Sequence, residues 1–284
     1  MTTGLPELDD TSVRTWGTGL VQLVNRHLPK PVKRGDGHAI EDWPLAGTAY
    51  LTKATGTLES MFFLFGQEEK RAHDATVLLR SLYENILVFS WVGIDPAAHL
   101  PRWIKSVCDM GIKADDDWKT ISVSLLDARN REYAEKKIND KSVKFAPKNP
   151  QMAQAIDDHW HRTYPGHPTM TGTDEDLLTF RGLYRHVYRL GSQAVHQDPR
   201  SLNAFFTTDA TGFTSAHTEK PGRYYLYPWL FGDHVVTLGL AIASSVLGWP
   251  HADEVWAIRE AAFSSVGTLR SRSITGDDGR GLTR

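Results

Sequence analysis

Apolar residues recur at three- and four-residue intervals along most of the chain after residue 45, a spacing typical of helices with one buried face. Leu58, Met61, Phe62 and Phe65 form a clear example. Start and stop signals divide the pattern into predicted helices at about 46–66, 67–93, 97–112, 118–138, 150–163, 174–197, 228–248 and 251–269. The expected fold is therefore all-α, with helices 46–66, 67–93 and 174–197 packed as a bundle and the others peripheral.

Several segments depart from this pattern. Residues 203–227 are rich in threonine and glycine, and both a short hairpin and an ordered loop remain open for them. Residues 115–117 are three aspartates, which we interpret as a solvated turn before a helix that starts at Trp118. Thr173 precedes an acidic run and is the expected cap of helix 174–197. We expect an N-terminal extension with a short helix at 1–45, one helical domain at 46–269 and a flexible tail at 270–284.

Composition narrows the class of protein. The 284 residues contain 32 basic and 34 acidic side chains, which excludes a uniformly basic nucleic-acid coat but not a local basic patch. Cys108 is the one cysteine, so an internal disulfide and a cysteine-rich metal site are excluded. The acidic N-terminus does not resemble a signal peptide, and the most apolar stretch contains Asp233 and His234. We expect a cytoplasmic protein with no membrane segment, metal or cofactor.

One candidate segment lies inside helix 67–93. Arg80 and Glu84 are four residues apart, so they share a helix face and can form an ion pair. Their neighbours are mostly apolar, which favours partial burial and a structured polar centre. The alternative is a solvated surface ion pair.

A second candidate segment lies in helix 174–197. Arg189 and His196 are seven residues apart, close to two helical turns, and project from nearly the same side. Gly191 would let another helix backbone approach this helix. A fixed cation beside an imidazole suits the binding and cleavage of a phosphodiester. The alternative is that His196 only caps the C-terminus of the helix. The same stripe includes Arg185, Tyr188 and Ser192.

These two segments resemble a known superfamily. Arg189 and His196, with six residues between them, are similar to the arginine–histidine motif of HEPN proteins, small α-helical proteins that include RNA-cleaving toxins and phage-defence nucleases. The Arg-Ser-Leu-Tyr-Glu segment at 80–84, paired with the later Tyr-Arg-x-x-Ser-x-x-x-His segment, more closely resembles an uncharacterised bacterial family related to abortive-infection proteins. The likeness covers roughly residues 45–205.

The resemblance implies a metal-independent endoribonuclease of phage defence or growth arrest. Arg189 and His196 would be its catalytic pair, and the site would form in a homodimer, with an inhibitory or defence-system protein as a partner. Leu190 stands where such nucleases commonly have a polar residue. This difference favours the alternative, a non-catalytic binding or regulatory module in which the cluster is structural. The residues expected to support the pair are Arg80, Glu84, Tyr188 and Ser192.

Basic residues gather at 129–148, where seven positive side chains accompany three negative ones. Such a patch can contact an RNA backbone. The residues we expect to bind RNA are Lys136, Lys137 and Arg185. Arg185 lies on the predicted helix 174–197, which contains the arginine–histidine motif and which we call the motif helix. The alternative for residues 129–148 is a solvated helix face.

Overall fold

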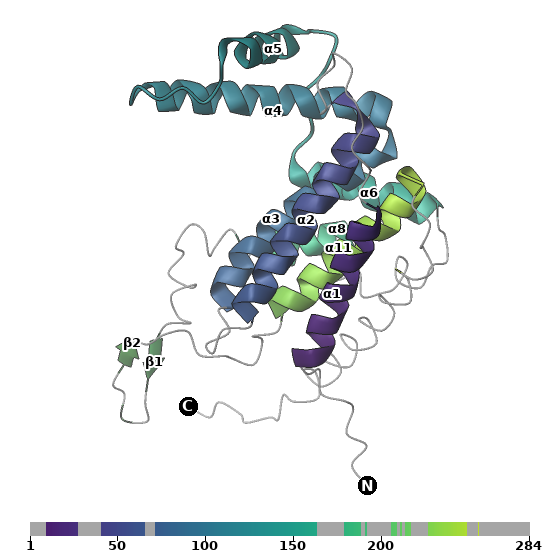
Figure 1. Cartoon of the computed structure of the whole chain (residues 1–284), viewed down its shortest axis with the longest axis vertical. Helices are drawn as coiled ribbons and strands as arrows, with labels where there is room; N and C mark the ends of the chain where they lie inside the picture. Colours follow the sequence, from purple (N-terminus) through teal and green to yellow (C-terminus); the bar gives the residue numbers. More distant parts are fainter. Residues whose placement is uncertain are drawn as a thin grey trace, which may run out of the picture. The chain divides into compact units, whose positions relative to one another are not determined.

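The structure, a computed structural model, describes residues 10–27, 41–65, 72–163, 179–188, 206–208, 214–216 and 227–248, together with residues 191, 211 and 255. These residues are helical apart from short connections and one two-stranded hairpin (Figure 1). The predicted all-α class is therefore confirmed.

Four predicted helices have closely similar bounds in the structure. They are α2 (Trp43–Phe65), α3 (Ala72–Ile94), α6 (Asn149–Thr163) and α11 (Tyr227–Val246). The helix expected within the first 45 residues is α1 (Asp10–His27). The helix predicted at 251–269 and the tail at 270–284 lie outside the described residues, except for Val255, which is helical.

The chain divides into two compact units. The first consists of residues 1–27, 54–82 and 190–284, and the second of residues 28–53 and 83–189. Helices α2 and α3 contribute residues to both units. The boundaries that the sequence predicts at residues 45 and 270 stay predictions.

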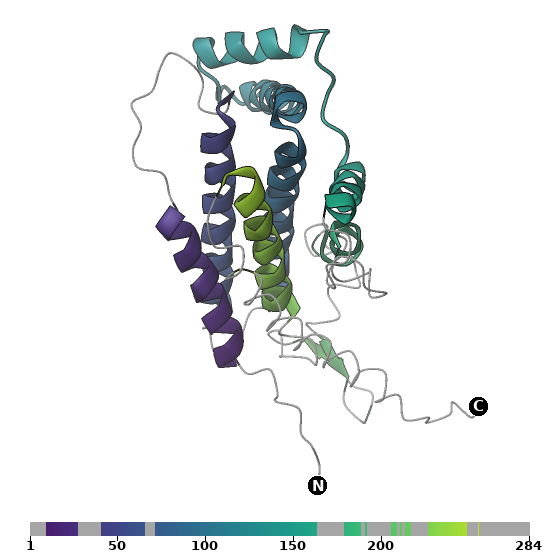
Figure 2. The same ribbon diagram turned by 90° about the vertical axis from the view of Figure 1, so that its right-hand side faces the viewer.

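In the first unit, α11 packs against α2 and α3. A Cβ placed on Gly232 of α11 would lie 3.1 Å from Met61 Cε and 3.2 Å from Leu58 Cδ1, so the α11 backbone comes close to α2. The Trp229 indole donates a hydrogen bond to the Met61 carbonyl at 2.7 Å. Its ring centroid is 4.7 Å from that of Phe65. Helix α1 lies beside α11 (Figures 1 and 2). These contacts form the apolar core of the unit.

Within the part of the chain that the structure describes, two helices are long and apolar enough to cross a membrane, judged by length and composition alone. They are Asp74–Ile94 in α3 and Pro228–Val246 in α11, and 67% and 78% of their most apolar windows are buried inside the protein. Core helices of globular proteins have this property, because a helix that is apolar all round is one that other helices surround.

In the second unit, α4 (Pro96–Lys119) follows α3 after a single residue. Asp95 caps α4, since its carboxylate accepts a hydrogen bond from the Ala98 amide at 3.1 Å. Helix α5 (Ala128–Asn139) is capped in the same way by Asp127. It lies across α4, as the two views of Figures 1 and 2 show.

The structure corrects the prediction for residues 115–138. A turn at 115–117 and a helix from Trp118 were expected, but α4 continues unbroken to Lys119 and α5 begins only at Ala128. The physical reason is that Asp115 is buried rather than solvated. Its carboxylate binds the end of α4 to the connection that follows. The residue that was expected in a solvated turn is therefore a buried residue that holds this connection in place.

The partners of Asp115 come from three places in the second unit. Its Oδ1 accepts the backbone N–H groups of Leu125 at 2.6 Å and Leu126 at 3.0 Å. Its Oδ2 forms ion pairs with Lys119 at 2.8 Å and Arg131 at 2.7 Å. Together these donors offset the desolvation of a buried carboxylate.

The helix predicted at 174–197 begins later than expected. Thr179 has an extended backbone (φ −99°, ψ 161°), and its hydroxyl accepts the Gly182 N–H at 3.0 Å, so Thr179 caps α8 (Phe180–Leu183). The helix continues as a π-helical turn, η2 (Tyr184–Tyr188). Thr173, the expected cap, lies outside the described residues.

The segment 203–227 contains a hairpin. Strand β1 (Phe206–Thr208) pairs antiparallel with β2 (Thr214–Ala216), with Phe206 opposite Ala216 and Thr208 opposite Thr214. Of the two alternatives that the sequence left open, the structure has the hairpin.

Candidate functional site

The first candidate segment lies on α3, as predicted. Arg80 and Glu84 are both half-buried and one turn apart. Leu79, Leu82 and Tyr83 between and beside them are buried. The two charged side chains therefore stand at the margin of the packed face of α3 rather than on a fully solvated surface.

Tyr83 connects α3 to α8 within the second unit. Its hydroxyl donates a hydrogen bond to the Phe180 carbonyl at 2.8 Å, and the two ring centroids are 6.4 Å apart. Burial raises the pKa of the Tyr83 hydroxyl well above its ordinary value, and the negative charges of Asp157 and Glu84 raise it further. Tyr83 is therefore a neutral hydrogen-bond donor that fixes the start of the motif helix.

Asp157 of α6 caps the same helix start. Its carboxylate oxygens accept the Phe180 and Arg181 backbone N–H groups, each at 2.9 Å, and Arg181 Nε lies 3.3 Å from Oδ2. A carboxylate at a helix N-terminus is stabilised by the free N–H groups there. Burial nevertheless raises the pKa of Asp157 to about 6, since desolvation outweighs those donors.

The π-helical turn η2 comes directly before the predicted catalytic arginine. Tyr184 and Tyr188 stack with ring centroids 4.8 Å apart, while Val187 is buried and Arg185 is exposed. Single π-helical turns inserted in helices are rare, and they occur frequently at functional sites.

Gly191 lies against α3 in the first unit. A Cβ built on Gly191 would be 2.6 Å from Arg80 Cβ and 3.1 Å from the Thr76 carbonyl oxygen. Any side chain larger than hydrogen would collide there, so the position requires glycine. The close backbone approach predicted for Gly191 is therefore present, and its neighbour is the turn of α3 that contains Arg80.

The predicted catalytic pair, Arg189 and His196, lies outside the described residues, as does Ser192. The structure brings Gly191 of that segment to Arg80. Glu84 and Tyr184 both lie close enough to Tyr83 for their charges to raise the pKa of its hydroxyl. The convergence of all the predicted site residues stays a prediction.

The expected RNA-binding residues have different surroundings. Lys136 and Arg185 are exposed. Lys137 is engaged in an ion pair with Glu41, with Nζ 2.5 Å from Oε1. Arg131, another member of the basic patch, forms ion pairs with Asp115 and Asp116, which reduce the positive charge of the patch.

Two residues that position the motif helix, Tyr83 and Asp157, are not among the site residues predicted from the sequence. Tyr83 has a signal in its spacing, because it falls on the apolar face of α3 between Arg80 and Glu84. Asp157 has no such signal, since its partner amides are more than twenty residues away in the chain.

The fold and the two polar segments define an all-α protein whose motif helix is anchored to α3 and α6. The model of a family of unknown function, DUF5677, matches residues 45–213, and the chain belongs to that family. The matched range includes both candidate segments. No protein with a curated description and no solved structure matches the chain.

Proposed function

We propose that this protein is a metal-independent endoribonuclease of the HEPN type, with Arg189 and His196 as its catalytic pair. The observation that supports this best is the contact of Gly191 with Arg80. Gly191 lies between Arg189 and His196 in the chain, so the motif segment and the α3 polar segment are neighbours. A nuclease site built from the two segments needs this adjacency.

The proposed reaction uses the 2′-hydroxyl of the RNA. His196 accepts its proton, and the 2′-oxygen attacks the adjacent phosphorus. The bond from phosphorus to the 5′-oxygen breaks, and that oxygen takes up a proton from solvent water, to which His196 later releases the proton that it accepted. Arg189 stabilises the negative charge that grows on the phosphate oxygens. The products are a 2′,3′-cyclic phosphate and a 5′-hydroxyl, and the oxidation state of every atom is unchanged.

The remaining polar residues have supporting roles in this proposal. Arg80 and Glu84 orient the pair from α3, while Ser192 and Tyr188 border it on the motif helix. Arg185 and Lys136, which are exposed, contact RNA phosphates. Lys137 does so only by exchanging its pairing with Glu41 for a phosphate.

The biological setting is also part of the proposal. We place the enzyme in the cytoplasm, in phage defence or growth arrest, with an inhibitory or defence-system protein as partner and with the site formed in a homodimer. The burial of most of the apolar windows in α3 and α11 supports a location away from the membrane.

Cleavage of total RNA in the presence of a chelator tests the proposal. Wild type, Arg189→Ala and His196→Ala are compared, with Arg14→Ala as a control because Arg14 is an exposed arginine of α1 that belongs neither to the motif segment nor to the basic patch at 129–148. Circular dichroism verifies that each variant is folded. We expect cleavage by wild type and by the control and none by the two motif variants. A folded wild type that leaves RNA intact would favour the non-catalytic binding module.

A further inference from the structure

Exposed apolar side chains gather on one part of the second unit, which we call the arm (residues 96–148, comprising α4, α5 and their flanking segments). Within the described residues, six of the eight large exposed apolar side chains belong to it. Ile121 is the most exposed of the six, at 65%. They are Met110, Trp118, Ile121, Val123, Leu125 and Phe145. Exposed apolar groups that occur together mark a surface that another molecule covers.

Most of these side chains lie at the tip of the arm (residues 109–127), and the tip is held in one conformation. Asp115 binds the backbone of Leu125 and Leu126, and Thr120 donates its hydroxyl to the Asp117 carbonyl at 2.6 Å. The apolar side chains are therefore presented on a fixed frame, and binding needs little ordering of the chain.

The tip and the root of the arm have opposite charges. The tip contains five aspartates and two lysines, and Arg131 of α5 pairs with two of these aspartates, Asp115 and Asp116. The root (residues 136–148) contains five lysines and one aspartate, and one of these lysines, Lys137, pairs with Glu41. With these pairs included, the tip keeps an acidic excess and the root a basic excess. At the root, Lys141 and Lys144 are exposed, and at the tip Asp117 is exposed. Each arm thus has an acidic, apolar tip and a basic root. Because their charges are opposite, the tip of one copy and the root of another can attract each other.

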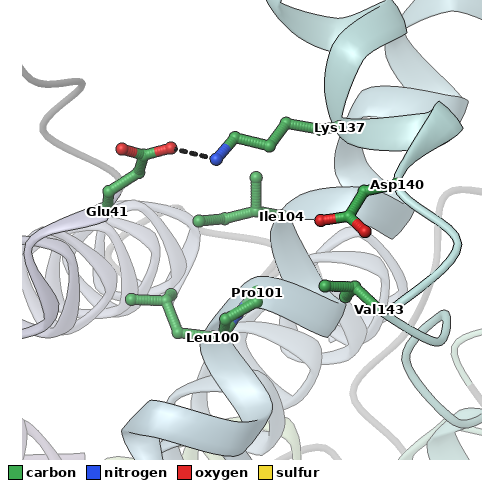
Figure 3. A pocket seen from close by; sticks show the side chains of 7 residues that line it. All are labelled: Glu41, Leu100, Pro101, Ile104, Lys137, Asp140 and Val143. Atoms are coloured by element: carbon green, nitrogen blue, oxygen red, sulfur yellow. Dashed lines mark ion pairs between the residues drawn. The ribbon is translucent and has the colours of Figure 1, made fainter.

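The root also contains a recess that can receive an apolar side chain. A pocket of about 180 Å³ lies between α4 and the segment after α5 (Figure 3). The ion pair of Glu41 with Lys137 lies on one side of it and Asp140 on the other. Its apolar lining residues are Leu100, Pro101, Ile104 and Val143.

We propose that the arm is a homodimer interface in which the tip of each copy docks on the root of the other. Two arms related by a two-fold axis make this contact twice. Helix α4 has 24 residues and so spans about 36 Å, enough to separate the two contacts. Each of the two contacts then has to bury only half of the roughly 1,600 Å² of accessible surface that a standard interface buries. This proposal does not rest on RNA cleavage.

Molar mass in solution is the first test, measured by light scattering on the full chain over a wide range of concentration. We expect a dimer of 31.8 kDa chains in wild type. Ile121→Ser removes an exposed apolar side chain and should shift the dimer to monomer. Phe63→Ser, an exposed apolar side chain on α2, is the matched control and should leave the dimer intact. A monomeric wild type would overturn the proposal, even where the tip then bound lipid vesicles or another protein.

Substitutions that reverse the charge of one residue at the tip or at the root test whether the tip of one copy docks on the root of the other. Asp117→Lys at the tip and Lys144→Glu at the root should each weaken dimerisation about tenfold or more, because each makes two like-charged contacts. A mixture of the two variants, and the double variant alone, should dimerise again. Glu132→Lys, the same change of charge on an exposed residue of α5 outside tip and root, is the control. Dimers unaffected by either single variant, or variants whose mixture stays monomeric, would contradict the arrangement.

Discussion

A Cβ placed on Gly191 would lie 2.6 Å from the Cβ of Arg80, closer than two side chains can approach. The backbone at Gly191 therefore rests directly on α3. This contact fixes where the segment begins relative to the polar turn of α3, and the proposed function depends on it.

Gly191→Ala should destabilise the protein by about 1–3 kcal/mol, because the added methyl group overpacks the contact with Arg80. Urea denaturation measures this change. Gly56→Ala in α2 is the matched control, since a Cβ there meets nothing within 4 Å. The control should gain about 0.5–1 kcal/mol, as expected for alanine in an open helical position. Equal effects of the two substitutions would contradict the close approach.

Asp115→Asn should lower the thermal midpoint, because it removes the charge that pairs with Lys119 and Arg131 but keeps an oxygen for the Leu125 and Leu126 amides. The same pairs hold the pKa of Asp115 well below its ordinary range. Its stabilisation is therefore present above the ordinary aspartate pKa and is lost as the pH falls below it.

The exposed Asp158 of α6 provides the control for Asp115, since Asp158→Asn should leave the midpoint unchanged. Matching losses in both variants would mean that the tip is not held by the buried carboxylate.

Asp157 should make stability fall as the pH rises. Burial raises its folded-state pKa to about 6 from an ordinary value of about 4, so between these pH values the folded chain binds a proton that the unfolded chain has released. The contribution favours folding below about pH 4 and is lost as the pH passes about 6.

The Asp157→Asn variant isolates this effect. The difference in unfolding free energy between wild type and variant should change by up to about 3 kcal/mol across that pH window. Denaturation at several pH values measures it. A difference that stays constant from pH 4 to 7 would show that Asp157 does not titrate as its burial requires.

Asp233 of α11 is a buried carboxyl with no hydrogen-bond partner for either oxygen among the described residues of the first unit. Burial raises its pKa well above the ordinary value, so ionising it at higher pH should weaken the fold. Asp233→Asn removes the titration and should become increasingly more stable than wild type as the pH rises. Asp158→Asn, at an exposed position, is the control and should show no such trend.

Much of the helical framework could be predicted from the sequence, because an apolar period of 3.6 residues is a local property. The bounds of α2, α3, α6 and α11 follow from it. The close approach at Gly191 was also predictable, since a glycine inside a helix that otherwise packs commonly marks a place where another backbone comes near.

The errors arise where distant partners decide the structure. Three successive aspartates look solvated, yet Asp115 is buried because Arg131 lies sixteen residues further along the chain. The first turn of α8 is another case, because Thr179 accepts the Gly182 amide while Asp157 from α6 accepts the Phe180 and Arg181 amides. No local pattern contains these partners.

We propose that the 2′-hydroxyl of RNA is the nucleophile, that His196 activates it and that Arg189 stabilises the charge on the phosphate. The most direct test of this proposal is the chemistry of the cleaved ends, measured after incubating the full chain and a chelator with an RNA and with its fully 2′-O-methylated counterpart. We expect that only the unmodified RNA is cut and that its fragments end in 2′,3′-cyclic phosphate and 5′-hydroxyl groups. We also expect Arg189→Ala and His196→Ala to abolish the cut. Cleavage of the methylated RNA, cleavage that survives in both variants, or an intact RNA with folded wild type would contradict the proposal.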